Sequence, residues 1–146
     1  MRVILFDIDG TLVSTGGAGV KAFGEAFELA FGISNATEKT KFSGRTDFSL
    51  FRELCEWNKV EFSIPNRELF FNHYLQLIDK HLNETVGGPF PGVVKMLDDL
   101  ASAPTPPAIG LLTGNIEEGA KRKLSTYNLW DRFSFGGFAN DNEDRN

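Results

Sequence analysis

A short apolar run that ends in two closely spaced aspartates constrains this chain more than any other feature. Residues 3–6 read VILF and are followed by Asp7, Ile8 and Asp9. A continuous apolar run of this length predicts a parallel strand that is buried on both faces. Open α/β sheets bind their ligands at the carboxyl ends of their strands. Residues two apart in an extended segment point to the same side, so Asp7 and Asp9 are expected to share a cleft there.

Two carboxylates in one cleft repel unless a cation lies between them or one of them keeps its proton. The first solution is a divalent metal site for phosphate chemistry, and the second pairs a nucleophile with a general acid/base. A bare Asp-x-Asp is more often a solvated turn, because Asp and Gly are common turn residues. The strand before it and the Gly10-Thr11-Leu12 after it make the functional interpretation more specific.

The string LFDIDGTLV, residues 5–13, resembles motif I of the haloacid dehalogenase-like (HAD) hydrolase superfamily, most of whose members are Mg²⁺-dependent phosphotransferases. The resemblance implies that Asp7 is the nucleophile that forms an aspartyl-phosphate and that Asp9 is the general acid/base. It also implies Mg²⁺ as cofactor, with Asp7 and Asp9 as its ligands, and it places Gly10 and Thr11 at the substrate. Dehalogenases of the superfamily usually lack the second aspartate, so Asp9 indicates phosphoryl transfer.

A second strand-tip motif is LLTGN at residues 111–115. The Thr113 hydroxyl can bond a phosphoryl oxygen, Gly114 lets the backbone approach that oxygen, and Asn115 is expected to cap the following helix, whose N-terminus favours anions. Alone, this pattern fits an ordinary strand–turn–helix connection. Downstream of motif I it resembles HAD motif II, which implies that Thr113 binds phosphate.

A phosphatase also needs a cation that offsets the charge of the phosphate and the nucleophile. Many capped HAD phosphatases carry Lys-Pro shortly after the third strand, and Arg145 stands where that pair is expected, so Arg145 resembles motif III with Arg in place of Lys. Lys123, on the helix after motif II, is the alternative, and Lys121 is a third candidate. Helix lysines are commonly only solvated.

Apolar spacing predicts further elements on either side of these motifs. The expected helices run from Val20 to about Gly32, onward from an N-cap at Asp47, from Pro65 to Leu82, from Val93 to Leu100 and over about Glu117–Tyr127, and the expected strands are Ala108–Leu112 and Phe133–Phe138. Their order predicts an α/β fold, a HAD-like Rossmannoid parallel sheet with helices on both faces and an inserted all-helical cap. The core is expected at residues 1–15 and 88–146, and the cap at 16–87.

The cap contains the loop Ser43-Gly44-Arg45-Thr46-Asp47. It resembles the substrate-specificity loop of such caps, which implies that Gly44 and Arg45 bind substrate, although a plain capped turn with a surface arginine fits equally well. His73 and His81 are expected to be surface or packing residues, because no acids accompany them at metal-ligand spacing.

Composition limits the partners and the setting. The chain has 146 residues, a net charge of −5 and one cysteine, Cys55. This charge gives no attraction to nucleic acid or anionic lipid, and no apolar run reaches membrane-spanning length. A single cysteine forms no internal disulfide, so a cytoplasmic protein is expected. The HAD resemblance implies a small phosphorylated metabolite as partner.

The sequence also lacks the fourth HAD motif, a later strand ending in acids that complete the Mg²⁺ site, so the chain resembles a member truncated before motif IV. The unfinished sheet edge would need covering, and a homo-oligomer is one way to do so. The expected function is that of a phosphoglycolate phosphatase-like HAD enzyme with a helical C1-type cap, hydrolysing a small phosphomonoester. A phosphomutase of the same superfamily, or an inactive fragment that only binds, remains open. A phospho-accepting receiver is disfavoured, because receivers lack a large helical insertion after the first strand.

Overall fold

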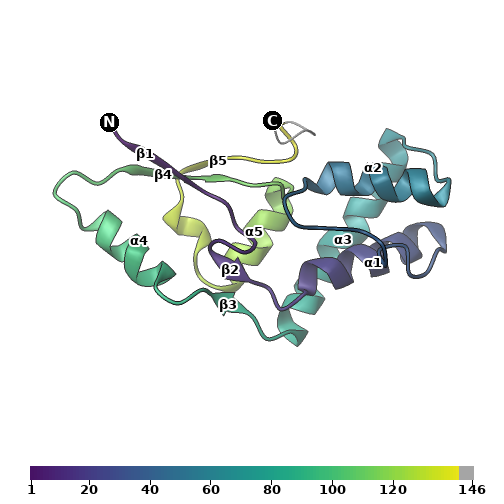
Figure 1. The fold of residues 1–146 in the computed structure, drawn as a ribbon, viewed down its shortest axis with the longest axis horizontal. Coiled ribbons are helices and arrows are strands. Elements are labelled where there is room, and N and C mark those ends of the chain that lie inside the picture. The colour runs from purple at the N-terminus through teal and green to yellow at the C-terminus, as the bar shows by residue number, and fades with distance from the viewer. Residues whose placement is uncertain (142–146) are drawn as a thin grey trace.

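The computed structural model describes residues 1–141 and shows an α/β fold (Figure 1). In chain order its elements are β1 (Val3–Phe6), β2 (Val13–Ser14), α1 (Ala18–Phe31), α2 (Asp47–Asn58), α3 (Ile64–Glu84), β3 (Gly88–Pro89), α4 (Val93–Ala101), β4 (Ala108–Leu112), α5 (Glu117–Thr126), a 3-10 turn (Trp130–Arg132) and β5 (Phe135–Gly137). The order of strands and helices predicted from the sequence is confirmed. None of the helices in this part of the chain is both long and apolar enough to cross a lipid bilayer.

The main sheet is parallel and has the strand order β1-β4-β5. Phe6 of β1 stands opposite Leu111 of β4, and Leu111 stands opposite Gly136 of β5. This register brings the carboxyl ends of β1 and β4 to the same edge of the sheet. Asp7 and Thr113, which directly follow these strands, therefore start from neighbouring positions.

Helices cover one face of this sheet in residues 1–141. Phe6, Ile109 and Leu111 belong to a hydrophobic cluster with Leu97 of α4 and Leu124 of α5. Figure 1 shows both helices on the same side of the strands. The opposite face is open, and its large side chains are exposed: Val3 (50%), Leu5 (48%), Leu112 (56%) and Phe135 (44%).

Two details of the predicted sheet are therefore corrected. The expectation that the first strand is buried on both faces is wrong, because Val3 and Leu5 are about half exposed. Within the described residues, helices on both faces are not found either. A continuous apolar run shows that both faces of a strand are apolar, but it does not say which element covers each face. The last strand is also shorter than the predicted Phe133–Phe138, since the chain forms the 3-10 turn before it.

Helices α1, α2 and α3 build a second hydrophobic cluster, which is rich in aromatic rings. The ring of Phe23 lies edge-on to those of Phe70 and Tyr74, with centroids 4.9 and 5.1 Å away. Phe51 stacks on Phe70 at 4.8 Å. Such pairs add to the stabilisation from buried area, so this cluster helps to hold the three helices together.

The chain enters and leaves the three-helix unit side by side. Val13 of β2 pairs with Pro89 of β3 in a short antiparallel ladder. Gly87 is packed so closely here that a Cβ atom would lie 2.4 Å from the Ser14 carbonyl oxygen. The predicted division into a core of residues 1–15 and 88–146 and a cap of residues 16–87 stays a prediction.

The start of α2 differs from the sequence-based expectation. Thr46, not Asp47, is the N-cap residue, and its side chain accepts a hydrogen bond from the Ser49 amide at 3.1 Å. Asp47 is the first helical residue, and its carboxylate is used elsewhere: it accepts a hydrogen bond from the amide of Ile116, 69 residues away along the chain. The prediction of Asp47 as the N-cap residue is wrong, because Thr and Asp are both common N-cap residues. Only the contact of Asp47 with Ile116 distinguishes the two positions.

The two leucines at the end of β4 make a matched pair that tests this one-sided packing. Leu111 is 1% exposed and Leu112 is 56% exposed. We expect Leu111→Ala to lower the free energy of unfolding by about 2–5 kcal/mol, because it leaves a cavity in the core. Leu112→Ala is expected to cost less than about 1 kcal/mol. Denaturant unfolding of both variants measures the difference, and equal costs would contradict the open face.

Candidate active site

A cleft of about 350 Å³ lies where the carboxyl ends of β1 and β4 meet the three-helix unit. The strand tips supply Asp7, Asp9, Thr113, Gly114 and Asn115 to its lining, and α5 supplies Lys123. The helical unit supplies the opposite wall. Clefts at this edge of a parallel sheet are the usual ligand sites of α/β proteins.

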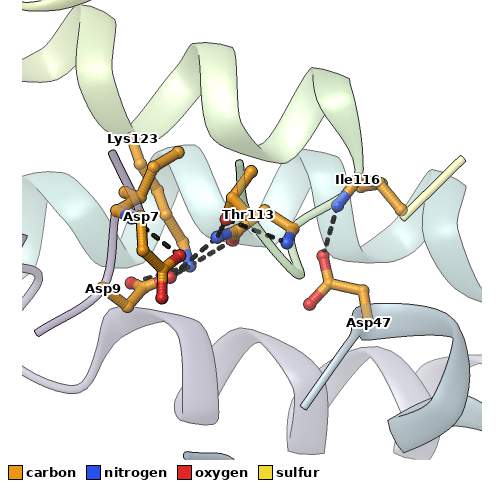
Figure 2. A network of polar contacts seen from close by, with 8 residues as sticks. Asp7, Asp9, Asp47, Thr113, Ile116 and Lys123 are labelled. Atoms are coloured by element: carbon orange, nitrogen blue, oxygen red, sulfur yellow. Dashed lines mark hydrogen bonds and ion pairs between the residues drawn. The ribbon is translucent and has the colours of Figure 1, made fainter. Parts of the chain in front are cut away.

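The first carboxylate of the cleft belongs to Asp7, at the end of β1. One of its oxygens, Oδ1, accepts a hydrogen bond from the Ile8 amide at 2.8 Å. Figure 2 shows the carboxylates of Asp7 and Asp9 close together, with the Lys123 side chain reaching them from α5. The structure thus brings the two acids of the DID string into one cleft, as their spacing predicts.

Lys123 joins these elements. Its Nζ donates hydrogen bonds to both carboxylate oxygens of Asp9 at 3.0 Å and to Oδ1 of Asn115 at 2.7 Å. Its side chain is only 6% exposed. A buried ammonium group is tolerated only when it is paired and hydrogen-bonded, and these three oxygens meet that requirement.

Asn115 completes the network. Its Nδ2 donates to Oδ2 of Asp9 at 2.8 Å and to Oγ1 of Thr113 at 2.7 Å. The expectation that Asn115 caps the following helix is wrong. Ile116 is the N-cap residue of α5, and its apolar side chain forms no cap hydrogen bond. The side-chain amide of Asn115 is engaged with Asp9 and Thr113 instead.

The network fixes the charge of Asp9. Partial burial raises the pKa of its carboxyl, but the Lys123 ammonium and the hydrogen bonds from Asn115 and Lys123 lower it by more, so the net pKa lies below its ordinary value. Asp9 is therefore ionised near neutral pH in this arrangement.

Asp47 is a residue of this region that the sequence analysis did not select as a site residue. Its backbone amide donates to the Gly114 carbonyl at 2.7 Å, and its Oδ2 accepts from the Ile116 amide at 2.8 Å. Figure 2 shows this contact between α2 and the start of α5. Burial raises the pKa of Asp47 from 3.8 to about 6, although Lys123 and the Ile116 amide oppose the rise. The sequence carries no signal for this contact beyond the capping pattern around Thr46.

Gly114 is held at close range by the same part of the helical unit. A Cβ atom at Gly114 would lie 2.2 Å from the Arg45 carbonyl oxygen, closer than any side chain could be placed. Glycine is therefore required here by the approach of the Arg45–Thr46 backbone. Its predicted role in binding phosphate stays a prediction.

The predicted cap loop reaches the cleft, and Gly44 and Arg45 both line it. The Arg45 guanidinium, however, is engaged by the helix that follows it, α2. It donates to Oε2 of Glu53 at 2.7 Å and to the Ser49 carbonyl at 3.3 Å. The ion pair neutralises the charge that was expected to meet the substrate.

The remaining predicted residues are placed as follows. Gly10 lines the cleft with a φ of +76°, whereas Thr11 is exposed and does not line it. Lys121 is an exposed residue of α5. Arg145 lies outside the described residues.

Within the described part of the chain, the two acids are not accompanied by a metal-binding cluster. Among residues 1–141, no group of three or more His, Cys, Asp or Glu side chains is placed to hold a metal ion. His81 has a different partner: its Nε2 lies 2.6 Å from Oε2 of Glu25, which ties α3 to α1. This contact agrees with the expectation that His81 is a packing residue.

Comparisons with known proteins identify the family. The model of the family described as haloacid dehalogenase-like hydrolase matches residues 4–144. Among curated proteins, no match was found. Several solved structures share the fold. CbbY from Rhodobacter sphaeroides, solved in complex with phosphate, is 16% identical with a TM-score of 0.73, and the alignment covers 94% of this chain and 63% of CbbY.

Two further structures are similar. A predicted phosphoglycolate phosphatase from Haemophilus somnus is 16% identical with a TM-score of 0.67, over 98% of this chain and 64% of that protein. A HAD hydrolase of family IA, variant 3, from Entamoeba histolytica is 18% identical with a TM-score of 0.67, over 92% of this chain and 58% of that protein. At these identities the likeness concerns the fold, and the chain spans less than two thirds of each of these relatives.

The raised pKa of Asp47 predicts a pH dependence of stability. Its pKa in the folded state, about 6, exceeds the ordinary value of 3.8, so the folded protein binds this proton more tightly than the unfolded chain. The contribution of Asp47 to the free energy of unfolding therefore falls as the pH rises from about 4 to about 6, by at most about 3 kcal/mol. Asp47→Asn removes this titration while its amide oxygen can still accept from Ile116.

The measurement is denaturant unfolding of wild type and Asp47→Asn near pH 4 and near pH 7. Other carboxylates, Asp9 among them, change stability in the opposite direction, so only the difference between the two proteins reports on Asp47. We expect the variant to lose less stability, or to gain more, between the two pH values. The same pH response in both proteins would contradict a raised pKa.

Proposed function

This chain belongs to the haloacid dehalogenase-like hydrolase family, and we propose that it hydrolyses a small phosphomonoester through a covalent intermediate on Asp7. The observation that carries this proposal is the network at the strand ends. A carboxylate at the tip of β1 stands beside a second carboxylate whose charge is fixed by a buried lysine and an asparagine. Such a site offers a nucleophile, an acid/base and hydrogen-bond donors for an anion within one cleft.

In the first step, an oxygen of Asp7 attacks phosphorus. The new O–P bond forms as the bond between phosphorus and the ester oxygen breaks, and the leaving oxygen takes a proton from Asp9. Since the pKa of Asp9 is lowered in the free protein, this step needs a change in its surroundings. A phosphoryl dianion provides that change, because a nearby negative charge raises the pKa of a carboxyl.

In the second step, a water molecule attacks the phosphorus of the aspartyl-phosphate. Asp9 takes a proton from that water, the bond between Asp7 and phosphorus breaks, and inorganic phosphate leaves. The ionised form of Asp9 is the form that this step needs, and the ion pair with Lys123 favours it. The two steps together return Asp7 to its carboxylate and Asp9 to the protonated form that it has with substrate bound. The proton that Asp9 takes up from solvent when the phosphoryl dianion binds is released again when phosphate leaves.

Lys123 and Thr113 are the groups proposed to hold the phosphoryl oxygens. The Lys123 ammonium lies within the same network as Asp9, so it can shift toward an incoming anion without leaving the cleft. The Thr113 hydroxyl accepts a hydrogen bond from Asn115, which leaves its own proton available for a phosphoryl oxygen. Preorganised donors of this kind lower the barrier by stabilising charge in the transition state.

Mg²⁺ fits the donor set in part. The ion prefers oxygen ligands and is commonly held by one or two carboxylates together with substrate phosphate and water. The Asp7 carboxylate suits it, whereas both carboxylate oxygens of Asp9 are engaged by Lys123, so Asp9 would contribute through its main-chain carbonyl. When bound, Mg²⁺ would offset the negative charge that gathers around the phosphoryl group.

The proposal predicts that Asp7→Asn abolishes hydrolysis. Loss of the nucleophile should lower kcat for an aryl phosphate, measured in the presence of Mg²⁺, by at least roughly 10³-fold. Asp131→Asn is the matched control, because Asp131 is exposed and lies in the 3-10 turn, away from the cleft lining. Full turnover by Asp7→Asn would contradict the covalent mechanism. No turnover by folded wild-type protein would contradict the proposed activity of this chain and favour a unit that only binds.

Two lysines on α5 provide a second matched pair. Lys123 is buried against Asp9, whereas Lys121, two residues earlier, is exposed. We expect Lys123→Met to lower kcat by about 10²–10³-fold, as removal of one charged donor from a transition state does. Lys121→Met should change it less than about twofold. Circular dichroism verifies that both variants are folded, and equal effects on kcat would rule out a special role for Lys123.

A further inference from the structure

The cleft has an apolar wall that the proposed chemistry does not use. Its apolar lining comes from the three-helix unit and from the turn after β3: Val20, Phe23, Phe42, Leu50, Tyr74 and Phe90. Val20 and Phe90 are 43% and 38% exposed, so this wall can be reached from solvent. A substrate that places its phosphoryl group at Asp7 has this wall available for the rest of the molecule.

The cations that line the cleft within residues 1–141 are Arg45 and Lys123, and each is already paired. Lys123 is held by Asp9 and Asn115. Arg45 donates from Nη1 to Glu53 and from Nη2 and Nε to Ser49, at 2.7, 3.3 and 3.4 Å. Its guanidinium is thus directed along the following helix, α2.

The carboxylates of the cleft outnumber its cations. Asp7, Asp9 and Asp47 all line it. A phosphoryl group already adds negative charge and competes for Lys123. A second phosphate or a carboxylate on the same substrate would lose hydration without gaining a partner, which is strongly unfavourable. An uncharged group on the apolar wall gains from the removal of apolar surface from water.

We propose that the substrate is a phosphomonoester whose leaving group is uncharged and at least partly apolar, and that bisphosphates and phosphorylated carboxylic acids are rejected. This inference rests on the proposed phosphatase function. It also bears on the phosphomutase alternative, because a mutase that regenerates a phospho-aspartate from a bisphosphate has to accept a substrate with two phosphates.

The test uses two ligands that differ by one carboxylate. Benzylphosphonate and 4-carboxybenzylphosphonate share the ring and the phosphonate, and neither is hydrolysed. Titration calorimetry on wild-type protein with Mg²⁺ gives both dissociation constants. We expect the carboxylated ligand to bind at least about 10-fold more weakly. Equal or tighter binding of the carboxylated ligand, or no binding of benzylphosphonate, would overturn the inference.

A matched pair of variants tests the role that the Arg45 ion pair has in this preference. Glu53→Gln releases Arg45, so we expect the difference between the two ligands to shrink to less than about threefold. Glu56→Gln, an exposed residue on the same helix, should leave the difference unchanged. If Glu53→Gln leaves the preference as large as in wild type, charge pairing at Arg45 is not its cause.

Hydrolysis of the corresponding esters separates this inference from the proposed function. Phenyl phosphate and 4-carboxyphenyl phosphate again differ by one carboxylate. Turnover of both esters with equal kcat/KM would overturn the inference and leave the phosphatase proposal standing. No turnover of either ester, with the binding preference intact, would overturn the phosphatase proposal and leave the selectivity of the cleft established.

Discussion

The ion pair between the buried Lys123 and the half-exposed Asp9 is the interaction on which the site depends. It joins the tip of β1 to α5, and through Asn115 it reaches the tip of β4. The Lys123 ammonium would not be stable alone at this depth, because a buried ammonium without a partner carries a large desolvation penalty, whereas the Asp9 side chain is 46% exposed. The pairing therefore fixes the positions of three elements and the protonation of Asp9 at the same time.

A second contact determines where the helical unit sits relative to these strand tips. Asp47 bonds the backbone on both sides of Asn115, and Gly114 admits the Arg45 backbone at a distance that excludes any side chain. The loop that carries Thr113 and Asn115 is thus clamped between the sheet and α2. Any movement of the helical unit would have to break these hydrogen bonds, so the width of the cleft and the placement of the loop that carries Thr113 and Asn115 are coupled.

The sequence predicted the residues at the strand ends of this site better than the contacts between distant segments. Asp7 and Asp9 were found because a strand and a turn leave a local pattern, and Thr113 followed from the same reasoning. Asp47 could not be found, because its partner Ile116 is 69 residues away and its own neighbourhood shows only a capping signal. The open face of the sheet was missed for a related reason. The apolar side chain of Val3 indicates a face of the strand that is suited to packing. It does not indicate which element, if any, packs on that face.

The pKa values of two carboxyl groups near Lys123 are shifted in opposite directions. This difference bears on how the cleft can accept an anion. Asp9 touches Lys123 directly, and its pKa is lowered. Asp47 is buried without such a contact, and its pKa rises to about 6. At neutral pH both carboxyl groups are ionised, so two negative charges lie near the single Lys123 ammonium before any substrate binds. A phosphoryl group that draws Lys123 toward itself weakens the stabilisation of both carboxylates, which favours proton uptake by the cleft. In the proposed mechanism, binding of the anion and protonation of Asp9 are thereby linked through one ammonium group.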